Sequence, residues 1–229
     1  MSDVIKQTIL IKLKFFGMYF FISTLAYMVV TMALTPFIED LPYAVVELIT
    51  TQVITLFFAY VFMHFSPILQ GEYVHFRHPK IKMAELMFTI GTCILFYAMY
   101  YGINIIFVQS PTEQSMLAKN IFFESYAGTL GFFIILCIVA PIIEEWLCRG
   151  WLFQKLEALP VNSKVPLFLN GFVFSALHSQ YANYISFITL FYFGFYLAWI
   201  RRKFDNLIYC VIAHSIFNGF GFFTMWYYF

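Results

Sequence analysis

Long apolar blocks alternate with short polar connectors along the chain. Blocks of about 18 or more apolar residues with few charges are typical of membrane-spanning helices. We therefore predict an all-α fold, a polytopic transmembrane helical bundle with about seven spans. The fifth block is the shortest, and the polar connector RRKFD is expected to separate the last two spans. The spans are expected at residues 15–37, 44–63, 84–108, 126 through the segment PIIEEWLCRG, 165–178, 181–200 and 206–229.

The positions of lysine and arginine predict how this bundle is oriented. Positively charged residues are retained on the cytoplasmic side of a membrane. If the N-terminus lies inside, twelve of the 13 Lys and Arg residues fall in inner segments, and only Lys119 falls in an outer one. The pattern favours an N-in, C-out topology. The inner residues are Lys6, Lys12, Lys14, Arg77, Lys80, Lys82, Arg149, Lys155, Lys164, Arg201, Arg202 and Lys203.

Composition excludes a soluble globule. Hydrophobic residues make up 62% of the 229 residues and charged residues 11%, whereas soluble domains have about 45–50% and about 25%. The lipid bilayer is thus the first expected partner, and a net charge of +1 predicts no nucleic-acid partner. Cys93, Cys137, Cys148 and Cys210 stand in apolar runs without a CxxC pair, which predicts small buried hydrophobes rather than a disulfide or zinc framework.

Three ionisable groups on different predicted helices lie at comparable depth. At about 1.5 Å per residue, Glu144 and His178 lie about 26 Å and about 24 Å from the turn at residues 161–163 that joins their helices. His214 lies about 16 Å beyond the basic turn at residues 201–203. An ionised side chain at the bilayer centre costs roughly 2.5–3.5 kcal/mol. Three ionisable groups that share one depth inside apolar runs therefore indicate a functional site.

The two adjacent glutamates are expected to have different roles. Glu145 and Arg149 are four residues apart, share a helix face and can form an ion pair. Glu144 lies about 100° around the helix, which leaves it to face a cavity as a candidate general base. Pro141 removes one helix hydrogen bond and can bend the span just before the pair.

Two further pairs of residues have the same four-residue spacing. His214 and Asn218 point the same way, and an imidazole N–H and an amide so placed can donate to one developing oxyanion. Phe174 and His178 also share a face, where the aromatic ring can fix the rotamer of the imidazole.

These residues form three motifs in a fixed order. The segments EEWLCR, FSALH and HSIFN resemble the EExxxR, FxxxH and HxxxN motifs of the CAAX protease and bacteriocin-processing (CPBP or Abi) family of intramembrane endopeptidases. The resemblance implies that Glu144 and His178 activate a water, which attacks a peptide bond. It also implies that His214 and Asn218 stabilise the tetrahedral oxyanion, in a site open to the cytoplasmic half of the membrane.

The resemblance covers residues 126–229, which are therefore expected to form the catalytic core. Residues 1–125 are expected to be N-terminal transmembrane helices without motifs. Glu145, Arg149 and Phe174 have supporting roles in this interpretation. The expected substrate is a membrane-associated protein or peptide, cleaved in leader or bacteriocin-type processing or at a C-terminal CAAX-type site. Compact size and the absence of a retention signal favour the plasma membrane of a bacterium.

Three other interpretations remain open. Two Glu and two His also suit zinc, but the HExxH pattern is absent, so no cofactor is predicted and zinc is the alternative. A non-proteolytic immunity or regulatory protein would keep the fold and the motifs without turnover. A proton-coupled transporter would use the Glu pair as a relay, although the sequence has no inverted repeat or matching broken helices. No feature predicts an oligomeric state.

Overall fold

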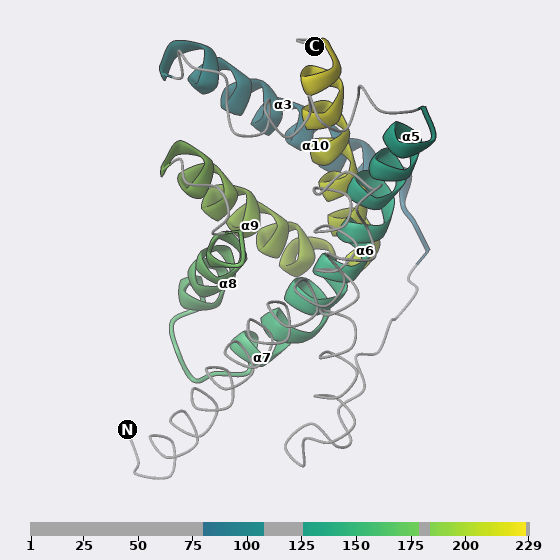
Figure 1. The fold of residues 1–229 in the computed structure, drawn as a ribbon. Coiled ribbons are helices and arrows are strands. Elements are labelled where there is room, and N and C mark those ends of the chain that lie inside the picture. The colour runs from purple at the N-terminus through teal and green to yellow at the C-terminus, as the bar shows by residue number, and fades with distance from the viewer. Residues whose placement is uncertain (1–79, 108–125, 179–183, 228–229) are drawn as a thin grey trace, which may run out of the picture. The chain divides into compact units, whose positions relative to one another are not determined.

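The computed structural model describes residues 80–107, 126–178 and 184–227 (Figure 1). These residues form helices and contain no strand, as the all-α prediction requires. The elements are α3 (Met83–Phe107), α5 (Tyr126–Ile134), η2 (Ile135–Val139), α6 (Ala140–Glu145), η3 (Trp146–Leu152), α7 (Phe153–Glu157), α8 (Lys164–Ala176), α9 (Tyr184–Phe204) and α10 (Leu207–Tyr227).

Four of the described helical segments are long and apolar enough to cross a membrane. They are Met83–Ile103, Thr129–Glu157, Tyr184–Phe204 and Leu207–Thr224. They correspond to the predicted third, fourth, sixth and seventh spans, and they make the chain a multi-pass membrane protein. The predicted first and second spans lie outside the described residues, so the count of seven and the orientation stay predictions.

The predicted fifth span is a shorter helix. α8 has 13 residues, about 20 Å at 1.5 Å per residue, which is less than the roughly 30 Å of a hydrocarbon core. It lies beside α9 in Figure 1 and packs closely against it. α8 by itself is therefore too short to cross a membrane, and His178 follows two residues after its C-terminal end.

The basic connector predicted after the sixth span is mostly helical. Residues 201–203 form the last turn of α9, where positive side chains are stabilised by the negative end of the helix dipole. Asp205 then turns the chain with a φ of 47°, which Asp tolerates better than most residues. The side chain of Asn206 accepts the N–H of Ile208 and so caps the start of α10. The connector is therefore two residues long.

Two glycines allow α8 and α9 to approach closely. A Cβ on Gly171 would lie 2.7 Å from the carbonyl oxygen of Phe191, and a Cβ on Gly194 would lie 2.9 Å from the Cβ of Phe174. Small residues permit such contact between membrane helices because packing, rather than the hydrophobic effect, drives their association. The close contact brings the backbone of α9 to the face of α8 that carries Phe174.

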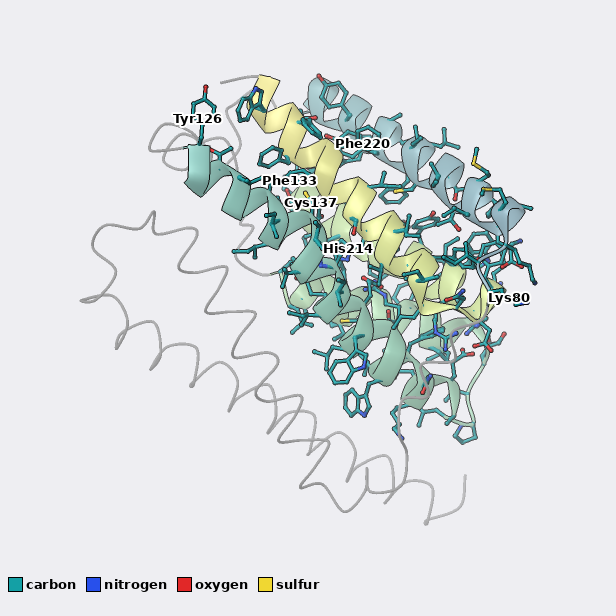
Figure 2. The ribbon with its side chains drawn as sticks, turned by 90° about the vertical axis from the view of Figure 1, so that its right-hand side faces the viewer. Lys80, Tyr126, Phe133, Cys137, His214 and Phe220 are labelled. Atoms are coloured by element: carbon teal, nitrogen blue, oxygen red, sulfur yellow. The ribbon has the colours of Figure 1, made fainter. Side chains whose placement is uncertain are left out.

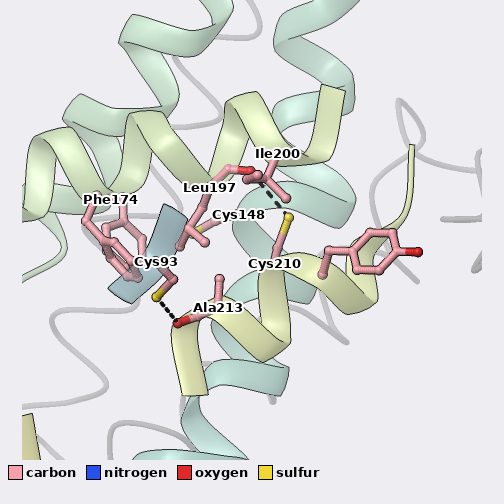
Figure 3. Close-up of a cluster of buried hydrophobic side chains, with 9 residues drawn as sticks. Cys93, Cys148, Phe174, Leu197, Ile200, Cys210 and Ala213 are labelled. Carbon is pink, nitrogen blue, oxygen red and sulfur yellow. Dashed lines mark hydrogen bonds between the residues drawn. The ribbon is translucent and has the colours of Figure 1, made fainter. Parts of the chain in front are cut away.

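A buried cluster fills the space where α3, η3, α8, α9 and α10 meet (Figure 3). All four cysteines are buried, as the sequence predicts. The thiol of Cys93 donates to the carbonyl of Ala213, and that of Cys210 donates to the carbonyl of Leu197. The members of the cluster are Cys93, Cys148, Phe174, Phe193, Leu197, Ile200, Tyr209, Cys210 and Ala213.

The helix α3 also packs on the helices that carry the motifs. Tyr196 on α9 donates its hydroxyl to the carbonyl of Thr89 on α3, and Tyr97 on α3 lies 2.6 Å from the hydroxyl of Thr224 on α10. The described residues all belong to one compact unit. α3, which carries no motif, therefore packs together with the helices that carry the motifs.

Candidate active site

The span that carries the glutamate pair is not a regular α-helix. The α-helical turns of α6 are flanked by two π-helical stretches, η2 and η3. In η2 the N–H of Ala140 reaches back five residues to Ile135, and at the end of η3 the N–H of Phe153 reaches back five residues to Cys148. Such widened turns are rare and frequently occur at functional sites. A widened turn thus lies directly before Pro141, and the bend expected at this proline stays a prediction.

Glu145 and Arg149 form the ion pair that their spacing predicts. An Nη1–Oε1 distance of 2.7 Å joins them, and both side chains are fully buried. Arg149 also donates to the carbonyl of Gly194 on α9, and its guanidinium lies 4.3 Å from the ring centre of Phe174. One arginine thus ties the glutamate-bearing span to both α8 and α9.

Glu145 has a second partner that the sequence did not indicate. The same Oε1 lies 2.8 Å from Nδ1 of His214 on α10. A carboxylate oxygen only accepts, so the Nδ1 atom carries the hydrogen. The helix lengths predicted that His214 lies at the same depth as the glutamate pair, but they did not predict which of the two carboxylates its imidazole contacts.

The end of α8 orients His178. Helix ends leave backbone carbonyls without their usual partner, and here the N–H of His178 donates to Ser175 rather than to Phe174. The carbonyl of Phe174 instead lies 2.8 Å from Nδ1 of His178. Because the carbonyl accepts, Nδ1 carries the hydrogen and Nε2 of the neutral ring keeps its lone pair.

Glu144 lies between the two imidazoles. Its Oε2 atom is 3.6 Å from Nε2 of His178 and 3.9 Å from Nε2 of His214. The side chains of Glu144 and His178 are 21% and 18% exposed, whereas that of Glu145 is fully buried. The two glutamates therefore differ as expected, since Glu144 lies on the accessible side and Glu145 lies beneath it.

The aromatic ring of Phe174 packs against both histidines of the site. Its ring centre lies 4.6 Å from that of His178 and 5.6 Å from that of His214. The ring is almost completely buried. It therefore packs against both imidazoles and the guanidinium of Arg149, which is a broader contact than the single one that its spacing with His178 predicts.

Asn218 lies one turn beyond His214 on α10 and contacts the glutamate-bearing span. Its amide donates to the carbonyl of Leu136 in η2, at 2.9 Å. In Figure 2, His214 lies near the middle of α10, which packs along this span. The sequence assigned Asn218 to an oxyanion, and the bond to Leu136 is a contact it did not suggest.

Six of the seven motif residues are thus linked by direct contacts, and Asn218 joins α10 to the same span at Leu136. Comparison with known proteins agrees with these motifs: residues 126–220 match the family model of type II CAAX prenyl endopeptidase Rce1-like proteins. This segment is Rce1-like in sequence. The match confirms the family recognised from the three motifs, and it covers α5 through most of α10.

One curated relative also resembles this chain. It is the UPF0177 protein YxdF of Lactococcus lactis subsp. lactis (strain IL1403), 23% identical over 145 residues, which are 61% of this chain and 76% of the relative. No solved structure matches. The Rce1-like segment and the apolar helices together indicate a membrane-embedded fold of the CAAX protease type.

Proposed function

We propose that this protein is an intramembrane endopeptidase whose catalytic residues are Glu144, His178, His214 and Asn218. The observation that carries the proposal is the position of Glu144. One partly exposed carboxylate lies within 4 Å of two imidazoles from two other helices, above a buried ion pair. Structural ion pairs have no need of a second, accessible carboxylate beside two histidines.

The first step is activation of a water by Glu144 and His178. A separation of 3.6 Å is too long for a direct hydrogen bond and suits a bridging water. The lone pair on Nε2 of His178 and the carboxylate can both accept from that water. Its oxygen then bonds to the peptide carbonyl carbon while its proton passes to Glu144.

The second role is stabilisation of the oxyanion by His214 and Asn218. Nδ1 of His214 donates to Glu145, and in the imidazolium form Nε2 is a donor as well. Nε2 can then donate to the oxyanion. The second amide hydrogen of Asn218 completes the pair of donors.

Collapse of the intermediate completes the hydrolysis. The C–N bond breaks, the nitrogen takes a proton from Glu144, and the products are an amine and a carboxylic acid, whose proton then passes to the amine. We propose a membrane-associated protein or peptide as substrate, in leader or bacteriocin-type processing or at a CAAX-type C-terminus. The Rce1-like match supports a peptide substrate in or at the membrane, and the identity of the cut sites will distinguish the two kinds of substrate.

The test compares the peptides of membrane and medium from cells that lack the protein. The cells are complemented with wild type, Glu144→Gln or the control Glu85→Gln, which alters an exposed turn of α3 paired with Lys82. We expect cut sites that appear with wild type and Glu85→Gln and fall by about 10²–10⁴-fold with Glu144→Gln. Full rescue by Glu144→Gln, at equal protein level, would instead indicate a non-proteolytic immunity or regulatory protein.

Metal dependence is tested on the same cut sites. Among the described residues, no three His, Cys, Asp or Glu side chains are arranged as a metal site, and we propose a metal-free reaction because Asn218 beside His214 suits donation better than ligation. Membranes treated with a chelator are expected to keep wild-type cleavage. Loss that added zinc restores would make the enzyme a metalloprotease.

A further inference from the structure

One carbonyl in η2 lacks its main-chain donor. The N–H of Ala140 bonds to Ile135, five residues back. The same five-residue pattern assigns the carbonyl of Leu136 to residue 141, which is proline and has no N–H. The π-helical turn and Pro141 together therefore leave Leu136 without a backbone partner inside a membrane span.

Asn218 fills this position from another helix. Its amide nitrogen lies 2.9 Å from the carbonyl oxygen of Leu136. In a bilayer every backbone polar group has to be satisfied within the protein, because no water is present to replace a missing donor. The amide of Asn218 thus takes the place of the N–H that Pro141 lacks.

A second asparagine provides a contrast on the other side of the glutamate pair. Asn170, buried on α8, donates to the carbonyl of Cys148 in η3 at 2.8 Å. That carbonyl already accepts the N–H of Phe153. Loss of Asn170 therefore removes a second bond from a satisfied carbonyl, whereas loss of Asn218 leaves Leu136 with none.

The alternative structure of this segment shows what the bond controls. If η2 rewound to an α-helix, the N–H of Ala140 would bond to Leu136 and that of Val139 would bond to Ile135. Such a change of one residue rotates the following turn by about 100° relative to the preceding one. Glu144, three residues after Pro141, would then point away from one or both imidazoles.

We propose that Asn218 is a positioning residue, which substitutes for the missing donor of Pro141 and so holds Glu144 in register with His178 and His214. The effect on cleavage rests on the proposed function, and the effect on stability does not. The bond to Leu136 uses one amide hydrogen and leaves the other for the oxyanion, so the two roles of Asn218 are compatible.

A double-mutant cycle tests the proposal. Asn218→Leu is expected to lower the thermal midpoint of the purified protein in detergent by about 4–8 °C. Pro141→Ala supplies a backbone N–H that can bond to Leu136, and in the double variant most of this loss should return. Losses that simply add would overturn the proposal.

Two control variants test whether the rescue is specific to the carbonyl of Leu136. Pro166→Ala removes another buried proline, on α8, and should not rescue Asn218→Leu. Pro141→Ala should not rescue Asn170→Leu, whose partner Cys148 lies on the far side of the glutamates. Rescue in either control would show general helix stabilisation and overturn the assignment to Leu136.

Measuring cleavage distinguishes a positioning role of Asn218 from a purely structural hydrogen bond. With the wild-type-dependent cut sites as reporter, Asn218→Leu should reduce cleavage by about 10–100-fold, and the double variant should regain part of that loss. Recovery of the thermal midpoint without any recovery of cleavage would overturn positioning. If wild type yields no cut sites at all, the proposed function fails, and the thermal cycle still decides whether Asn218 replaces the donor.

Discussion

At the scale of single residues, the two adjacent glutamates separate into an accessible and a buried role. One oxygen of Glu145 accepts from both Arg149 and His214. The carboxylate therefore neutralises a buried guanidinium and also orients an imidazole of the proposed site. An aspartate or glutamate that holds a histidine in one tautomer is a general device for setting which ring nitrogen faces the reaction.

Because Glu145 and Arg149 form a buried ion pair, removing one partner should cost more stability than removing both. Arg149→Met leaves the buried carboxylate of Glu145 without its guanidinium partner and should cost about 3–5 kcal/mol, whereas removing both charges is often nearly neutral. We therefore expect the double variant Glu145→Leu with Arg149→Met to be more stable than Arg149→Met alone in thermal unfolding. It should remain inactive, because Nδ1 of His214 has lost its acceptor. A double variant that is no more stable than the single one would contradict this coupling.

At the scale of elements, the site depends on where α8 ends and how closely α8 and α9 approach. The end of α8 releases the carbonyl that orients His178. The contact between Gly171 and Gly194 brings the carbonyl of Gly194 within reach of Arg149. If α8 continued as a regular helix, the carbonyl of Phe174 would accept the backbone N–H of His178 and could not orient its imidazole. The early end of α8 is therefore useful to the site.

The close approach predicts a large effect of one methyl group. Gly194→Ala would place a Cβ 2.9 Å from the Cβ of Phe174 and 3.0 Å from the Cα of Gly171, so the helices have to separate. We expect a loss of about 1–3 kcal/mol and reduced cleavage, measured by thermal unfolding and by the cut sites. Gly131→Ala on α5 meets no atom within 4 Å and should be neutral or slightly stabilising. Equal effects of the two variants would refute the role of the contact.

At the scale of the whole molecule, basic residues gather at one end of the described unit. Arg202 at the end of α9 binds Glu157 at the end of α7 and the carbonyl of Ser163 before α8. Lys82, just before α3, donates its N–H to the hydroxyl of Tyr209 on α10. This clustering agrees with the charge pattern from which a cytoplasmic end was predicted.

The predicted topology leads to a test with fusion reporters. Alkaline phosphatase folds to an active form only on the outer side of a bacterial membrane. Fused after Phe229 it should be active, and inserted in the turn at residues 158–163 it should be inactive. The reverse pattern would require an inverted orientation and would move the site to the outer half of the membrane.

Much of this protein follows from the order of its residues alone. Apolar blocks and connectors predict the helices α3, α9 and α10 closely, because lipid requires long apolar runs whatever their neighbours. Four-residue spacing predicts the Glu145–Arg149 pair, because two residues one turn apart share a face in any helix. The motifs likewise indicated which polar residues to bring together.

Only the tertiary structure determined which groups from different helices contact one another. The hydrogen bonds from His214 to Glu145 and from Asn218 to Leu136 depend on how the helices are rotated against each other. They also depend, as the early end of α8 does, on which backbone carbonyls lack a partner. Helical periodicity carries no information on either. It describes one helix at a time, whereas these contacts arise where packed helices satisfy each other's polar groups in a medium that supplies no water.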